Sequence, residues 1–130
     1  MNIKLAKRAV SCKGWRRMGG MLLYLDGHRE VRMLTDSTFT VIASGRVIGW
    51  HDGAHAGLPD LDDPATLGCL TALVREAWGD PYFCVRVTGD RMATGEIGWD
   101  GSGTLRGKSC RVTMACSEAE VLVVALEGAC

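Results

Sequence analysis

No apolar run in this 130-residue sequence approaches the roughly 18 residues that a helix needs to cross a bilayer. The basic N-terminus, MNIKLAKRAVSCKGW, also lacks the continuous apolar stretch of a secretory signal. We therefore expect a cytoplasmic protein without a membrane partner. Its apolar content of 47% and charged content of 23% are ordinary for a globular chain, and its length predicts a single domain over residues 1–130.

The sequence has little of the chemistry that marks a cofactor or a catalytic site. Its six cysteines form no C-x-x-C pair and have no histidine at zinc-finger spacing, which favours reduced thiols over a zinc site. His51 and His55 lie four apart in HDGAH, but Gly53 disfavours the helix that would aim both at one metal. No nucleophile signature is present. We predict no enzyme activity, no metal and no cofactor, with an enzyme site assembled only by folding as a distant alternative.

One stretch, DGSGTLRGKS over residues 100–109, comes close to a phosphate-binding P-loop. Ser102 stands where the first glycine is required. The residues after Ser109 alternate like a strand, although phosphate binding needs a helix there. The pattern instead predicts a flexible hairpin connection from Asp100 to Gly107, and nucleotide binding is not expected.

Hydrophobic periodicity predicts an α+β fold in which an antiparallel sheet packs on a central helix. Period-two alternation and turn glycines indicate an N-terminal β-meander over residues 20–50 and C-terminal strands near 83–87, 91–99 and 108–116. Residues 51–62 are rich in glycine and aspartate, and they read as a polar loop.

Two segments have helical patterns. Apolar residues recur at intervals of three and four over about 64–78, and Asp63 and Pro64 fit the start of that helix. A capping-box spacing favours a second helix at about 118–128. The β-branched residues of 120–127 leave a strand there as the alternative.

The charge is zero overall but unevenly distributed, because residues 1–20 contain only basic side chains. We interpret residues 1–17 as a basic N-terminal arm, whose order the sequence leaves open. Such an arm with a tryptophan could track a phosphate backbone and stack on a base, which makes a small nucleic-acid-binding regulator our alternative function. The candidate contacts are Lys4, Lys7, Arg8, Lys13, Trp15, Arg16 and Arg17.

Lysine and arginine are absent between Arg46 and Arg75, a segment that is instead acidic. A cluster of aspartates without compensating bases can engage a basic protein surface or mimic nucleic-acid phosphates. The alternative is that the acids serve solubility and favour the start of the following helix. The candidate partner-binding residues are Asp52, Asp60, Asp62 and Asp63.

The stretch LPDLDDPATLGCLTALVREAWGDP, residues 58–81, resembles a segment of small proteins encoded by bacteriophages and prophages, typified by DPATLGCLLALVREAWG. GGMLLYLDGHREVRML and the SEAE…ALE ending are similar in pattern. The resemblance brings no activity and no functional residue with it, but it implies a phage accessory protein. We therefore expect non-enzymatic binding to a host protein, with inhibition of a defence system such as CRISPR as one possibility. The oligomeric state is left open.

Overall fold

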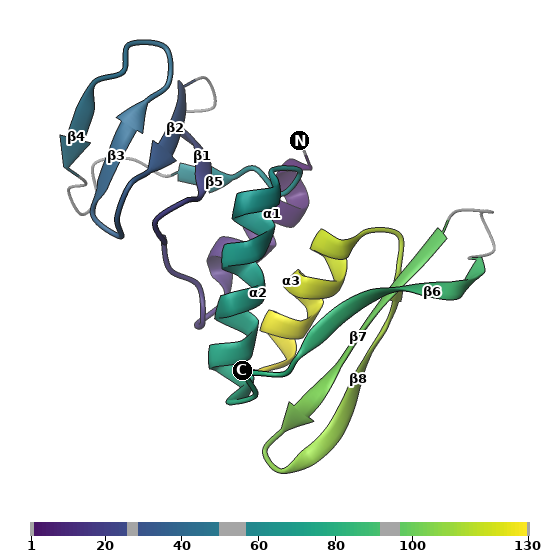
Figure 1. The fold of residues 1–130 in the computed structure, drawn as a ribbon. Coiled ribbons are helices and arrows are strands. Elements are labelled where there is room, and N and C mark those ends of the chain that lie inside the picture. The colour runs from purple at the N-terminus through teal and green to yellow at the C-terminus, as the bar shows by residue number, and fades with distance from the viewer. Residues whose placement is uncertain (1, 26–28, 50–56, 92–96, 130) are drawn as a thin grey trace. The chain divides into compact units, whose positions relative to one another are not determined.

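The computed structural model describes residues 2–25, 29–49, 57–91 and 97–129, and it confirms an α+β fold (Figure 1). The chain divides into two compact units, a first of residues 1–10 and 16–69 and a second of residues 11–15 and 70–130. The helices are α1 (Ile3–Ser11), α2 (Pro64–Trp78) and α3 (Glu118–Gly128). The strands are β1 (Leu22–Leu25), β2 (Arg29–Met33), β3 (Thr38–Val41), β4 (Val47–Gly49), β5 (Gly57–Pro59), β6 (Cys84–Arg91), β7 (Ile97–Leu105) and β8 (Lys108–Ala115).

The first unit is built on the predicted meander, an antiparallel sheet in the order β4-β3-β2-β1-β5. Alternation along the strands places Leu23, Val31 and Val41 side by side across β1, β2 and β3. These side chains are buried, as are Met33 and Phe39 on the same face. The opposite face, called here the outer face, receives the alternate residues of each strand.

Strand β5 corrects the predicted polar loop over residues 51–62. Its three residues pair with β1, with Leu58 opposite Tyr24. A strand that contains a glycine and a proline has no periodic signal, and proline is tolerated because β5 lies at the edge of the sheet. The rest of the predicted loop, up to residue 56, lies outside the described residues.

The basic arm begins with a helix. Asn2 caps α1, because its Oδ1 accepts a hydrogen bond of 3.0 Å from the backbone N–H of Leu5. Leu5, Ala6 and Ala9 form a buried side of α1, and each is at most 6% exposed. The first part of the basic arm, whose order the sequence left open, is therefore an amphipathic helix over Ile3–Ser11.

In the second unit, α3 contacts all three strands of an antiparallel sheet in the order β6-β7-β8 (Figure 1). Ser117 caps α3 by accepting a hydrogen bond of 3.2 Å from the N–H of Glu120, so the helix, not the alternative strand, forms at 118–128. At the end of α2, the indole Nε1 of Trp78 donates a buried hydrogen bond of 2.8 Å to the carbonyl of Ala125. This bond joins the two helices of the unit.

The glycine-rich stretch that resembles a P-loop is mostly strand, so the predicted flexible connection from residue 100 to 107 was wrong. Only Arg106 and Gly107 join β7 to β8, with φ of 52° and 78°, as a two-residue hairpin turn requires. Gly101 allows close packing instead of flexibility. A Cβ at this position would lie 2.9 Å from Phe83 Cζ and 2.9 Å from Val121 Cγ1.

Candidate partner-binding face

Strand register brings acidic and apolar side chains together on the outer face of the first unit. Tyr24 of β1 lies opposite Glu30 of β2, and the backbone N–H of Ile42 donates to the carbonyl of Glu30. Val47 of β4 lies on the same face, because it pairs with Thr40, which in turn pairs with Arg32, two residues after Glu30. Arg32 is therefore also on this face, where it is paired with Asp63. Ile42, in the turn after β3, lines a groove together with Glu30. Tyr24, Glu30, Ile42, Val47 and Asp60, which contacts Tyr24, are called here the acidic sheet face.

The Tyr24 hydroxyl links two carboxylates on this face. Its Oη donates to Glu30 Oε1 at 3.1 Å and lies 3.3 Å from Asp60 Oδ2. The hydrogen bond to Glu30 is the largest cause that raises the pKa of Tyr24 to about 12, followed by burial and the charge of Asp60. Tyr24 therefore stays a neutral donor at physiological pH, and its single proton bonds one carboxylate at a time, while both carboxylates lie within 3.3 Å of its Oη. Such a pair can accept hydrogen bonds from a lysine or an arginine of a partner.

An open groove of about 510 Å³ adjoins Glu30, and it is also lined by Arg29, Val41, Ile42 and Ala43. Ile42 is 49% exposed. Val47, next to it on the face, is 62% exposed. The groove can receive an apolar side chain of a partner next to the carboxylate of Glu30. Apolar contact beside fixed charge is the combination that protein interfaces use.

The structure gives the four predicted aspartates different positions. Asp60 joins the acidic sheet face, and its Oδ1 accepts a hydrogen bond of 3.0 Å from the N–H of Asp62, which is itself exposed. Asp63 is largely buried, and it is paired with Arg32. Asp52 lies outside the described residues. Partner binding by Asp60 and Asp62 remains a prediction.

Asp63 stabilises the start of α2. Its Oδ2 accepts hydrogen bonds from the N–H and the hydroxyl of Thr66, each at 2.9 Å, and from Arg32 Nη1 at 2.8 Å. The hydrogen bonds from Arg32 are the largest cause that holds the pKa of the Asp63 carboxyl below its ordinary value, against the effect of partial burial. The Thr66 hydroxyl in turn accepts a hydrogen bond of 2.9 Å from the N–H of Leu22. This chain of contacts ties β1 and β2 to the helix.

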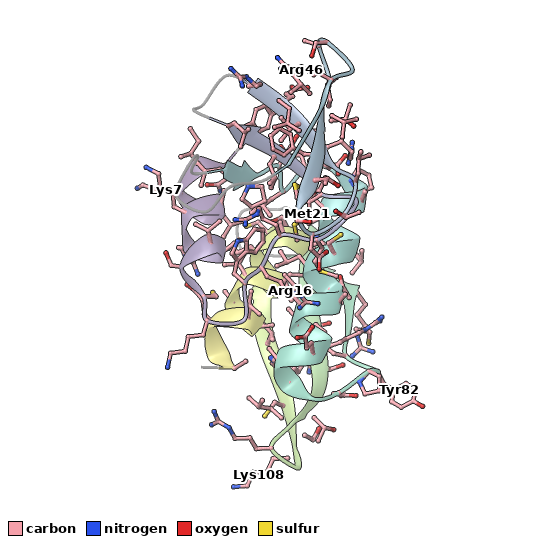
Figure 2. All side chains as sticks on the ribbon, turned by 90° about the vertical axis from the view of Figure 1, so that its left-hand side faces the viewer. Lys7, Arg16, Met21, Arg46, Tyr82 and Lys108 are labelled. Atoms are coloured by element: carbon pink, nitrogen blue, oxygen red, sulfur yellow. The ribbon has the colours of Figure 1, made fainter. Side chains whose placement is uncertain are left out.

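The predicted nucleic-acid contacts lie on α1 and in the segment that follows it. Lys4, Lys7 and Arg8 occupy the exposed side of α1, and Figure 2 shows Lys7 projecting away from the helix. The remaining four come after the helix, where Lys13 and Arg16 are exposed. Trp15 and Arg17 are half-buried there. A role in nucleic-acid binding remains a prediction for all seven residues.

Tyr24 and Glu30 were not among the candidates from the sequence. A signal for them exists, because a hairpin centred on Asp26-Gly27-His28 places Tyr24 and Glu30 at equal distances from its middle residue. The turn itself lies outside the described residues, but the register of β1 and β2 agrees with this symmetry.

Within the described part of the chain, no group of three or more His, Cys, Asp or Glu side chains is arranged to hold a metal ion. His51 and His55 lie outside it. Cys69, Cys84 and Cys110 are free thiols. No helix in the described ranges is long and apolar enough to cross a membrane.

Comparison of the chain with protein-family models, with curated proteins and with solved structures gives no match. The inference to function therefore rests on the chemistry of the charged surfaces. The acidic sheet face is the surface on which fixed charge, exposed apolar side chains and a groove occur together.

Proposed function

We propose that the protein acts by non-enzymatic binding to another protein, through the acidic sheet face. The observation that carries this proposal is the Glu30–Tyr24–Asp60 arrangement, which brings two carboxylates to one hydroxyl, with Glu30 and the exposed Ile42 lining the same groove. Rigid groups lose little conformational entropy when they bind, so charge held in this way favours a stable interface. The complementary surface carries a lysine or arginine next to an apolar side chain.

The resemblance of residues 58–81 to phage-encoded proteins supports a host protein as the partner. Proteins that hold nucleic acid present basic surfaces, so host defence proteins of that kind, CRISPR complexes among them, are the first candidates for a partner with an acidic binding face. This part of the proposal comes from genetic context and charge complementarity, not from a fold.

Affinity purification from a bacterial lysate, with and without nuclease treatment, tests the proposal. The chain is compared with the variants Glu30→Lys and Ile42→Asp, which change the charge and the apolar contact of the face. The matched control is Asp36→Lys, an exposed acid of the same unit in the turn between β2 and β3. We expect one set of host proteins to be retained by the chain and by the control, and to fall at least about tenfold with each face variant.

Two results would contradict the proposal. Equal retention by all three variants would show that the captured protein binds elsewhere. Loss of capture after nuclease treatment would show that nucleic acid mediates the contact, as expected if the basic residues Lys4 to Arg17 carry the function.

A further inference from the structure

A second charged surface lies in the second unit, on the face of the β6-β7-β8 sheet that α3 does not cover. Gly101 and Val112 are opposite each other on the α3 side, where Val112 is buried and Gly101 adjoins Val121 of α3. The alternate residues therefore point the other way. They include Cys84 and Arg86 of β6, Asp100 and Ser102 of β7, and Arg111 of β8, called here the arginine sheet face.

Asp100 holds the two arginines of this face in place. Its Oδ1 accepts a hydrogen bond of 3.2 Å from Arg86 Nε, and its Oδ2 accepts one of 3.1 Å from Arg111 Nε, with Arg111 Nη2 close to the same oxygen. The Asp100 side chain is only 4% exposed, whereas those of Arg86 and Arg111 are 64% and 69% exposed. The carboxylate lies beneath two guanidinium groups that face outward, so one positive charge is left over.

Asp100 stays charged in this setting. The hydrogen bond from Arg111 is the largest cause that lowers its pKa, and that from Arg86 acts in the same direction against the effect of burial. The arginines are thus fixed in position without being covered. An arginine held in this way can contact an external anion through its remaining N–H groups with little further loss of side-chain freedom.

Two further exposed bases lie at the hairpin turn, but they are not on this face. Lys108 pairs with Leu105 at the tip of the hairpin (Figure 2), and alternation from Arg111 places it on the α3 side of the sheet. Arg106 Nη2 donates a hydrogen bond of 3.5 Å to the carbonyl of Ala129, the residue that follows α3. The positive charge of the arginine sheet face therefore comes from Arg86 and Arg111.

Asp80 is an acid of the same unit, and its Oδ2 accepts a hydrogen bond from the N–H of Thr104. The same oxygen lies 2.9 Å from the Cβ position of Gly103, which points toward Phe83, so Asp80 lies on the α3 side and not on the arginine sheet face.

We propose that the arginine sheet face binds the sugar-phosphate backbone of a nucleic-acid duplex. Arginine and hydroxyl side chains are the usual partners of phosphate oxygens, and both occur on this face, at Arg86, Arg111 and Ser102. An acidic protein is a poorer match, because no exposed apolar side chain lies among the residues that define the face, and protein interfaces have an apolar core. A single strand is also a poorer match, because none of these residues is an aromatic on which a base could stack.

The experiment measures fluorescence anisotropy of a labelled 20-base-pair DNA duplex of mixed sequence at salt concentrations from about 25 to 200 mM. Each phosphate contact contributes roughly −0.9 to the slope of log K against log [salt]. We expect Arg86→Gln/Arg111→Gln to reduce the magnitude of the slope by about two and to weaken binding at low salt by about tenfold or more. The conservative pair Arg86→Lys/Arg111→Lys is expected to keep most of the slope, because it keeps the charge.

The matched control is Arg29→Gln/Arg46→Gln, which removes the same charge from two exposed arginines of the first unit and is expected to leave the slope unchanged. Circular dichroism of every variant shows whether the fold is intact. If the glutamine pair unfolds, the single variant Arg86→Gln, which leaves Arg111 paired with Asp100, tests the proposal through a slope reduced by about one. No binding at 25 mM salt would overturn the proposal. The same conclusion would follow if the two glutamine pairs had equal effects, if Lys4→Gln/Lys13→Gln alone abolished binding, or if a single strand or polyglutamate bound more tightly than the duplex.

Discussion

The addition of one methyl group at Gly101 tests the packing that supports the arginine sheet face. In Gly101→Ala the new Cβ would lie 2.9 Å from Phe83 Cζ and from Val121 Cγ1, well inside the 3.5–4.0 Å at which carbon atoms attract. Phe83 and Val121 are both 0% exposed, so neither can move into solvent. Overpacking of this kind costs about 1–3 kcal/mol, and the loss of a flexible strand glycine returns about 0.5–1 kcal/mol. We expect a net destabilisation of about 1–2 kcal/mol.

Gly68→Ala is the matched control, because it adds the same methyl group in a different setting. Gly68 is exposed within α2, and no atom lies within 4 Å of its Cβ position. Alanine is favoured over glycine in a helix by about 0.8–1.0 kcal/mol, so this variant is expected to be more stable than the original chain. Urea unfolding followed by circular dichroism measures both changes. If Gly101→Ala were as stable as Gly68→Ala, β7 would not pack against Phe83 and Val121 as described.

Three further predictions concern single side chains. Because the pKa of Asp63 is lowered in the folded state, its charge stabilises the fold above the unfolded value of about 4, and this stability is lost as the pH falls through the lower folded value. Asp63→Asn, which can still cap the helix, is expected to cost about 1 kcal/mol at neutral pH and to flatten that acid dependence in urea unfolding. Ultraviolet difference titration is expected to show Tyr24 ionising at about 12, and Glu30→Gln is expected to move it toward 10. Trp78→Phe leaves the buried Ala125 carbonyl without its donor, and calorimetry is expected to show a loss of about 1–3 kcal/mol.

The helices α2 and α3 and most strands of this chain could be predicted because their signals are local, whereas α1 was not predicted and its residues were assigned to the basic arm. The helix at 64–78 combines a 3.6-residue apolar period with Asp63 and Pro64 at its start, and the structure places α2 at those residues. β5 could not be predicted in the same way, because three residues that form an edge strand depend on pairing with β1. The pairing with β1, a tertiary interaction, stabilises β5 although its own sequence does not favour a strand.

The main error in the prediction was the assignment of residues 100–107 to a flexible connection, and it arose from the glycines of that stretch. Gly101 and Gly103 suggested a loop, although they lie in β7, where side chains would collide with Phe83. When residues 100–107 are assigned to a loop, no strand register places Asp100 next to Arg86 or Arg111. The arginine sheet face depends on a three-strand register and was therefore missed, whereas Asp60 of the acidic sheet face was a candidate from charge alone and stays a prediction.

The zero net charge of the chain conceals a separation of charge within each unit. In the first unit, α1 contains basic residues and no acid, while the acidic sheet face brings Glu30 and Asp60 to Tyr24. In the second unit, α3 contains glutamates and no base, while the adjacent sheet exposes Arg86 and Arg111. Because the two sheet faces differ in sign and belong to different units, their variants are expected to act independently. Loss of duplex binding in Glu30→Lys, or loss of the host protein in Arg86→Gln/Arg111→Gln, would show that the faces serve one shared partner instead of two.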